Sequence, residues 1–420
     1  MRAITELRRA LFVMLLGSLV GCFAVGFRES ALGVTELLTG GSGPIGALRS
    51  LAPWQRMLLT GGTVIAAWFV ARAAIRRGKG RLGLSRLASS ARGDGQPPSL
   101  PVTLLHSGAT WLVTVGALSI GRESAIIETG GAIGACAVRN DEQRRPSMIA
   151  AGVAAAFAAA YHAPFSAVAY VEEHIGIRSS PRSLAYAVLG AASGVATVAV
   201  LFDGAAVLPG LERLDGRVVG LAAIGVLPAI AASLAFRVAR ERFPKPEAPR
   251  FGPVQWIAAA VAIGAVVVVP NVSGNGLEAL RLAADHPTVQ LALTLMLLKL
   301  VATTSLLHAG VPGGVFSPSL AVGAGAALAT LFALGWSADD ATSLWGAAIA
   351  AMAAAITISL RSPLLGALVV VELCGDPKLL PLTIGAALIA ALVDHSVSLL
   401  RGRFTRSDLL AKVPVSDADG

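Results

Sequence analysis

The chain has 420 residues, of which 55% are hydrophobic and only 14% are charged, and its mean hydropathy is +0.71. A soluble protein carries about 25% charged residues, so this composition excludes a soluble globular protein and indicates many membrane-crossing helices. The net charge of +9 does not indicate nucleic-acid binding, because the basic residues cluster in short connectors, which the positive-inside rule places in the cytoplasm.

The apolar segments predict an all-helical chain in two halves. Several segments are shorter than the roughly 20 residues that a crossing helix needs, and broken helices at membrane depth are tolerated only inside protein or beside a water-filled cavity. We predict a first membrane repeat at 1–207, a second at 208–400 and a short cytoplasmic tail at 401–420. The predicted helices are 4–37, 54–75, 84–91, 100–120, 124–138, 148–161, 164–175, 183–201, 218–240, 254–269, 288–307, 316–334, 342–358, 363–373 and 379–392.

The stretch Gly121-Arg122-Glu123-Ser124 places a charged pair within an otherwise apolar region. The apolar residues 102–120 precede it and a short predicted helix follows, so we expect Glu123 at or near a helix N-terminus. An ionisable residue at membrane depth is costly and indicates a functional site. Unpaired N–H groups at a helix N-terminus bind anions, so Glu123 could occupy an anion site itself and leave when protonated. The alternative is a structural carboxylate paired with Arg122.

A second stretch, Gly314-Val315-Phe316-Ser317-Pro318, lies 193 residues after the first. When the two are overlaid, the glycine and the serine of one fall on those of the other, and Glu123 falls on Phe316. The segments that begin at Pro164 and Pro363 form another pair, 199 residues apart, and each leads to glutamate. Two unlike motifs that repeat at nearly one spacing indicate duplicated halves. Interrupted segments in matching positions of two halves are typical of a transporter site near the middle of the membrane.

These motifs resemble the CLC family of chloride channels and chloride/proton exchangers. Gly121-Arg122-Glu123 is similar to the family's GREGP motif, and residues 313–320 are similar to its GGxFxPSL motif. The segment from Pro164 to Glu172-Glu173 resembles the family segment that ends in paired glutamates. The resemblance extends from about residue 10 to residue 400.

The resemblance implies an all-α polytopic membrane protein with an inverted repeat, in which broken helices meet at a midmembrane anion site. It further implies a homodimer with one anion path in each subunit. Glu123 would be the gate that competes with anions, and backbone N–H groups of Val315 and Phe316 would line the central site. Gly121, Arg122 and Gly314 would lie at the same anion site.

Three departures from the family pattern affect the site. The best match to the family's GSGIP loop at the right spacing begins Gly78-Lys79, which puts Lys79 in place of the anion-coordinating serine, although it also suits a cytoplasmic connector. The family's central tyrosine falls close to Ser398. The segment after Pro164 is one residue short, so either Glu173 or His174 would be the inner proton-transfer residue, unless both simply end a helix.

Several polar residues have no assigned role. Glu128 lies five residues beyond Glu123, partway round the same predicted helix, and we expect it to pair with a distant polar group. His106, His162 and His308 show no metal-ligand spacing, so we expect them to be packed or hydrogen-bonded and predict no metal site. The three cysteines lie in apolar surroundings and are expected to be buried.

The leading functional prediction is chloride/proton exchange gated by Glu123. A passive channel for chloride or another halide is the first alternative, and a non-transporting relative that binds or senses anions is the second. An enzyme is not expected, because a P-loop, a nucleophile elbow and a catalytic His/Cys/Asp cluster are all missing from the sequence. We expect chloride or another small anion, protons and membrane lipid as partners, no nucleic acid and no cofactor. The predicted location is the plasma (inner) membrane of a prokaryote, with both termini cytoplasmic.

Overall fold

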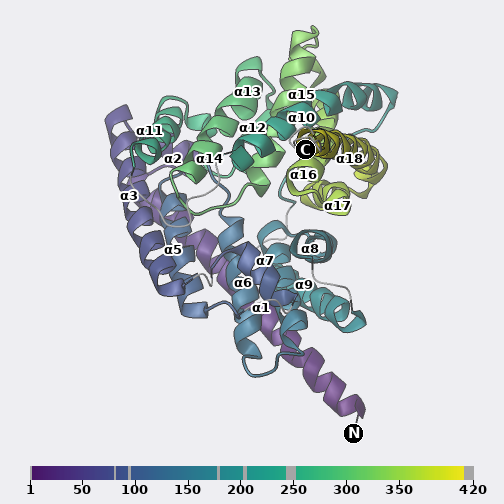
Figure 1. Cartoon of the computed structure of the whole chain (residues 1–420). Coiled ribbons are helices and arrows are strands. Elements are labelled where there is room, and N and C mark those ends of the chain that lie inside the picture. Colours follow the sequence, from purple (N-terminus) through teal and green to yellow (C-terminus); the bar gives the residue numbers. More distant parts are fainter. Residues whose placement is uncertain are drawn as a thin grey trace, which may run out of the picture.

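The computed structural model describes residues 2–79, 82–92, 96–176, 180–201, 206–242 and 252–410, without the side chains of residues 2, 3 and 401–410. These residues form helices joined by short turns (Figure 1). The longer helices are α1 (Arg2–Thr39), α3 (Pro53–Gly78), α5 (Leu100–Val115), α6 (Glu123–Ala137), α7 (Arg145–Tyr161), α9 (Pro181–Leu201), α10 (Gly216–Arg242), α11 (Pro253–Val268), α15 (Phe316–Ala333), α16 (Ala341–Leu360), α17 (Pro363–Cys374) and α18 (Leu380–Leu410). The shorter ones are α2 (Gly43–Arg49), α4 (Leu84–Ala91), α8 (Pro164–Ala169), α12 (Leu277–Asp285), α13 (Val289–Leu293) and α14 (Lys299–His308).

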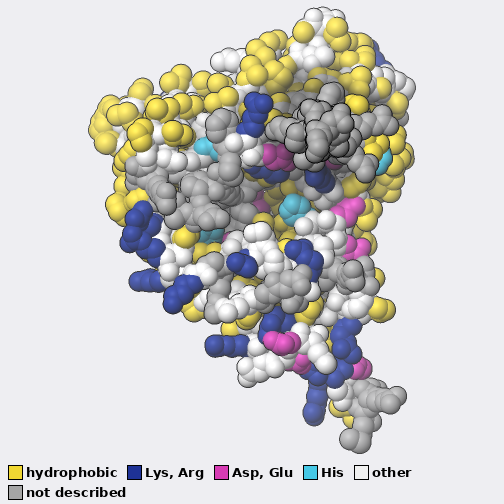
Figure 2. All heavy atoms as spheres, viewed as in Figure 1, with side chains coloured by type: hydrophobic (Ala, Val, Ile, Leu, Met, Phe, Trp, Pro, Cys, Tyr) yellow, Lys and Arg dark blue, Asp and Glu magenta, His cyan; other side chains and the backbone are white. Residues whose placement is uncertain are grey.

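The protein is built as an integral membrane protein. Among the described residues, eight helical segments are long and apolar enough to cross a membrane. Figure 2 shows hydrophobic side chains over the face that carries α11, α13 and α15, and Lys and Arg side chains gathered toward the end that carries the N-terminus. A broad apolar surface of this kind suits lipid contact, and the segregation of basic groups suits the predicted cytoplasmic side.

Small residues allow the central helices to approach closely. A side chain at Gly130 of α6 would lie 2.4 Å from the backbone oxygen of Gly152 of α7. At Gly323 of α15, an added Cβ would lie 2.5 Å from the Cβ of Ala355 of α16. Close helix contact through Gly and Ala is the usual means of packing helices in lipid. The abundance of these two residues therefore has a structural explanation.

Most predicted helices are present, with several differences, and α2 and α12 are helices that the sequence analysis does not predict. α5 ends at Val115 rather than residue 120, because Ala117 adopts a positive φ of 53°. The predicted helix 288–307 contains a π-helical segment, Thr294–Leu298, between α13 and α14. α18 continues past the predicted end at residue 392 to Leu410, and the rest of the predicted tail lies outside the described residues. The expectation of buried cysteines is wrong for Cys22 and Cys136, which lie on the exposed helix surface, and right for Cys374.

Candidate functional site

The two glycine motifs lie side by side. Gly121 donates its backbone N–H to the carbonyl oxygen of Gly314 at 2.9 Å, and Gly314 donates to Gly121 at 2.6 Å. A Cβ at Gly121 would lie 2.9 Å from the Gly314 oxygen, so the contact requires glycine. α6 and α15 each begin two residues after the bonded glycine, and this contact therefore joins the N-termini of two helices.

Glu123 is the first residue of α6, as the sequence predicts, and only 3% of it is exposed. Its Oε1 accepts a hydrogen bond from Nδ2 of Asn275 at 2.5 Å. Its Oε2 is buried and has no hydrogen-bond partner among the described residues. A buried carboxylate oxygen without a donor is unfavourable, which gives this group a reason to exchange its position for an anion or to take up a proton.

Asn275 belongs to a loop that a buried lysine holds in place. Lys299 of α14 is fully buried, and its Nζ donates to the carbonyl oxygens of Val272, Ser273 and Gly274 at 2.9, 3.3 and 2.6 Å. These three donations use every N–H of an ammonium group. The loop that carries the Asn275 amide is therefore fixed relative to the membrane helices, and Lys299 provides a buried positive charge below it.

An open cavity leads from the surface to Glu123. Its volume is about 570 Å³, and it is lined by Arg28, Glu29, Leu32, Gly43, Pro44, Arg122, Glu123, Ala160, His162, Ala206, Val207, Gly276, Leu277, Glu278, Arg281 and residues 273–275. The lining contains three arginines and three glutamates, so their formal charges balance, and Arg28 forms an ion pair with Glu29 at 2.6 Å. Arg122, the residue before α6, lies at its inner end beside Glu123.

Aromatic rings surround the start of α15. The Phe316 ring lies 4.6 Å from the Tyr161 ring and 5.4 Å from the Phe157 ring, measured between centroids. The Tyr161 hydroxyl lies 3.0 Å from Oγ of Ser317, in a hydrogen bond between two buried groups. Val315 is the residue before the helix, so the backbone N–H groups of Val315 and Phe316 belong to the N-terminus that faces Gly121.

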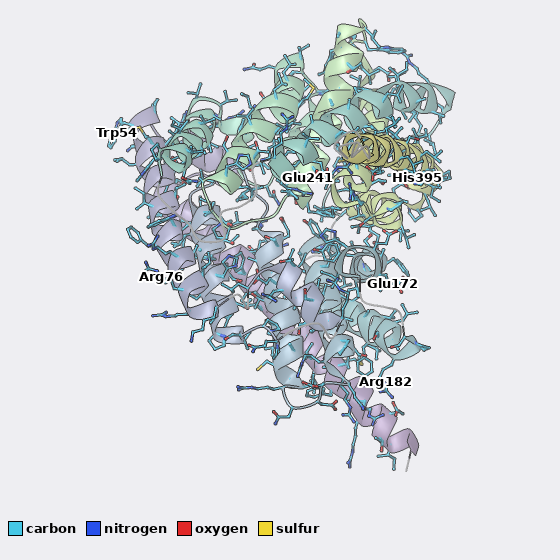
Figure 3. All side chains as sticks on the ribbon, in the orientation of Figure 1. Trp54, Arg76, Glu172, Arg182, Glu241 and His395 are labelled. Atoms are coloured by element: carbon cyan, nitrogen blue, oxygen red, sulfur yellow. The ribbon has the colours of Figure 1, made fainter. Side chains whose placement is uncertain are left out.

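The paired glutamate segment ends a broken helix. α8 continues as a π-helical segment, Tyr170–Ile175, which carries Glu172, Glu173 and His174 (Figure 3). Glu173 accepts hydrogen bonds from the backbone N–H groups of Leu364 and Leu365 at 3.1 and 2.9 Å, at the start of α17. The His174 ring packs against the Tyr170 ring, with 4.9 Å between centroids, and lies near the Leu360 carbonyl at the end of α16. Both residues thus contact the second half of the chain.

Lys79 and Ser398 lie apart from this cluster. Lys79 is exposed and follows α3 in a left-handed conformation, while Gly80 and Arg81 of the same loop lie outside the described residues. Ser398 is exposed on α18 and lines a cavity of about 220 Å³ together with Arg361, Asp394 and His395. Within the described part of the chain, neither residue makes a hydrogen bond or ion pair with Glu123 or Phe316, so their roles at the anion site stay predictions.

A family model described as voltage gated chloride channel matches residues 61–395. The chain belongs to this family, the CLC family. A ClC-type chloride channel ClcB from Citrobacter koseri is 26% identical over 416 residues, which cover 93% of this chain and 96% of the relative. A ClcB protein from Escherichia coli O17:K52:H18 is 25% identical over 414 residues with the same coverage. The protein is therefore a membrane protein of an anion-transport family, as the motifs predict.

Solved CLC structures share the fold. A slow cyanobacterial Cl⁻/H⁺ antiporter superposes with a TM-score of 0.75 at 19% identity, covering 97% of this chain and 99% of the other. A CLC-type fluoride/proton antiporter superposes with a TM-score of 0.71 at 19% identity, covering 93% of this chain and 96% of the other. The CLC architecture predicted from the motifs, with broken helices that meet inside the molecule, is confirmed.

Sequence reasoning missed three residues of the site. Sequence reasoning assigns no role to Asn275, and only the fold brings it to Glu123, 152 positions away. Lys299 is the single charged residue in an apolar helix, a signal that could have identified it. Tyr161 is one of only three tyrosines, but its contact with Ser317 spans 156 positions and leaves no local pattern.

Proposed function

We propose that the protein exchanges chloride, or a similar small anion, for protons, and that Glu123 is the gate. The observation that carries the proposal is the state of the Glu123 carboxylate: buried at the start of a helix, at the inner end of a vestibule, with one oxygen lacking a donor. Such a group can close the path as a tethered anion and open it by taking up a proton.

The anion would be held mainly by backbone dipoles. The N-termini of α6 and α15 meet at the glycine pair, and Val315, Phe316, Gly121 and Gly314 would supply the N–H groups around the central position. Arg122 would attract the anion from the vestibule. Binding by dipoles, with charged groups set back from the path, is strong enough for entry and weak enough for exit.

Purified protein in chloride-loaded liposomes tests the proposal. Chloride efflux and external pH are recorded together, with and without an ionophore that clamps the voltage. We expect chloride efflux to drive proton uptake against a gradient, and we expect Glu123→Gln to abolish proton movement while chloride still flows. Unchanged pH dependence in Glu123→Gln, or chloride efflux without proton movement in the unaltered protein, would contradict exchange.

A passive channel on the same scaffold is the second candidate, and the contacts of Glu173 favour it. Both carboxylate oxygens of Glu173 accept backbone N–H groups, which limits its freedom to carry protons. His174, the other predicted inner proton residue, packs its ring against Tyr170, with 4.9 Å between centroids. Glu173→Gln and His174→Gln measured in the same liposomes separate the two residues, since an inner proton residue loses proton flux and keeps anion flux when it is neutralised.

We further propose that the protein acts as a homodimer surrounded by lipid in the plasma (inner) membrane of a prokaryote, with both termini cytoplasmic. The bacterial source of the ClcB relatives and the basic groups near the N-terminus support this assignment. Lys79 and Ser398 would then face the cytoplasm. Mass measurement of the detergent-solubilised protein, and labelling of single cysteines introduced at each end, test the dimer and the orientation.

A further inference from the structure

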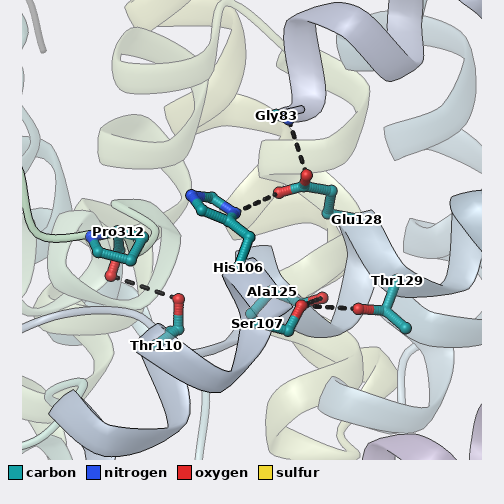
Figure 4. A network of polar contacts seen from close by, with 8 residues as sticks. All are labelled: Gly83, His106, Ser107, Thr110, Ala125, Glu128, Thr129 and Pro312. Carbon is teal, nitrogen blue, oxygen red and sulfur yellow. Dashed lines mark hydrogen bonds and ion pairs between the residues drawn. The ribbon is translucent and has the colours of Figure 1, made fainter. Parts of the chain in front are cut away.

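Glu128 forms a buried pair with His106 on the neighbouring helix. Its Oε2 lies 3.3 Å from Nδ1 of His106 on α5, and its Oε1 accepts the backbone N–H of Gly83 at 2.7 Å (Figure 4). The expectation that Glu128 pairs with a distant polar group is confirmed. The Glu128 side chain is only 6% exposed and the His106 side chain is 19% exposed, so His106 is the more accessible member of the pair.

The Glu128–His106 pair lies near the gate, because Glu128 and Glu123 are on the same helix. Glu128 lies five residues after Glu123 on α6, which is about 7.5 Å further along the helix axis. Gly83 precedes α4, whose first-turn N–H groups would otherwise be open to an anion. Glu128 thus accepts the N–H of the residue before α4, whereas Glu123 is itself the first residue of α6.

Polar groups continue from the pair toward the gate. Ser107, next to His106, lies 2.7 Å from the Thr129 hydroxyl and donates to the Ala125 carbonyl at 3.2 Å, two residues from Glu123. Thr110, one turn further, donates to the Pro312 carbonyl at 3.4 Å, beside the glycine motif of α15. Figure 4 shows these groups along the face of α5 that meets α6. Hydrogen-bonded Ser and Thr side chains commonly join helices in lipid, and here they extend a line of polar groups from the pair toward Glu123.

The charged and titratable residues around α6 form two groups, one near Glu123 and one near the Glu128–His106 pair. α6 packs against α1, α4, α5 and α7. On α1 and α7, Arg28, Glu29 and Tyr161 lie near Glu123, and Arg145 contacts the connector at Arg139 and Glu142. On the side of α4, the basic residues of the surrounding sequence include Lys79, Arg86 and Arg92. Among the described residues, His106 is an ionisable group that contacts Glu128.

We propose that the Glu128–His106 pair is an inner proton-binding site that supplies Glu123 with protons, an inference that rests on the proposed exchange. A neutral glutamine could also accept the Gly83 N–H and would avoid burying an ionisable acid, whereas a carboxylate makes the stronger hydrogen bond and can in addition hold a proton. The imidazole takes a proton from a cytoplasmic acid and passes it to the carboxylate. Water carries it from Glu128 to Glu123, and each O–H or N–H bond that breaks is replaced by one that forms.

Glu128→Gln, measured in the liposome assay beside the unaltered protein and Glu123→Gln, tests the inference. We expect Glu128→Gln to reduce proton flux at least tenfold while chloride flux stays within about threefold. His106 is the more exposed member of the pair, and His106→Gln should reduce proton flux severalfold and shift the pH dependence of that flux. Glu372→Gln is the matched control, because it also neutralises a buried carboxylate that accepts backbone N–H groups, and it should keep coupled proton movement.

The outcomes separate this inference from the proposed exchange. Suppose that Glu123→Gln abolishes proton flux while Glu128→Gln and His106→Gln leave it unchanged. That result would overturn the inference and leave the proposed exchange in place. If the unaltered protein moves no protons, the exchange fails, and infrared difference spectra between pH 5 and 8 still decide whether the pair binds a proton. A carboxyl band that is lost in Glu128→Gln supports the pair as a proton site, and the absence of such a band overturns it.

Discussion

Glu173 and Glu372 each cap the helix on which the other lies. Glu173, on the segment that continues α8, accepts the N–H groups of Leu364 and Leu365 at the start of α17. Glu372, near the end of α17, accepts those of Phe165 and Ser166 at the start of α8, at 2.9 and 2.7 Å. The two glutamates stand 199 positions apart, the same spacing as the two prolines that begin these helices. The duplicated halves are thus joined by a reciprocal contact.

Neutralising either glutamate should destabilise the protein by a similar amount. A glutamine keeps one acceptor oxygen and loses the negative charge at a helix N-terminus, so we expect each of Glu173→Gln and Glu372→Gln to lower the free energy of unfolding by about 1–2 kcal/mol. Thermal denaturation in detergent measures the change. A clear loss at one position with none at the other would contradict the reciprocal arrangement.

Asn275 should restrain the gate. Its amide donates to Glu123, and its own oxygen accepts the Leu277 N–H at 3.2 Å. Asn275→Asp keeps that acceptor, removes the donor and adds a like charge, which favours release of Glu123. We expect chloride flux to rise severalfold, which corresponds to about 1 kcal/mol. Asn275→Ala, which removes the donor without adding charge, should give a smaller rise, and unchanged flux in both variants would argue against the restraint.

Lys299 should be essential for the loop that carries Asn275. Lys299→Met fills a similar volume but leaves three buried carbonyl oxygens without their donor. Since an unsatisfied buried acceptor costs about 1–3 kcal/mol, we expect a loss of several kcal/mol, seen as a lower unfolding temperature and faster proteolysis of the loop. Lys378→Met, on an exposed turn, is the control. Equal stability of the two variants would show that Lys299 does not hold the loop.

The hydroxyl of Tyr161 should stabilise the start of α15. Tyr161→Phe keeps the ring against Phe316 and removes the bond to Ser317, while Ser317→Ala removes the same bond from the other side. We expect each variant to lose about 1 kcal/mol of stability and to bind chloride more weakly by titration calorimetry. The double variant should cost less than the two single losses together, because both remove one interaction. Additive losses would contradict a shared bond.

Local patterns in the sequence were sufficient for much of this molecule. Apolar length predicted the membrane helices, and the glycines and charge of residues 121–124 predicted a helix that begins at Glu123. The repeat of this motif at Gly314 predicted two related halves. These features depend on neighbouring residues, whose hydropathy and backbone freedom act within one helix or turn, so they can be recognised without a fold.

Only the tertiary structure decided which groups meet. The Asn275 amide on Glu123, the three carbonyls around Lys299 and the His106–Glu128 pair join residues that are 22 to 152 positions apart. Each of these contacts depends on how helices cross and on where a broken helix ends, which many side chains determine together. The chemical reason is the same throughout: in a medium without water, a polar group must find its partner within the protein, and the packing of the whole chain selects that partner.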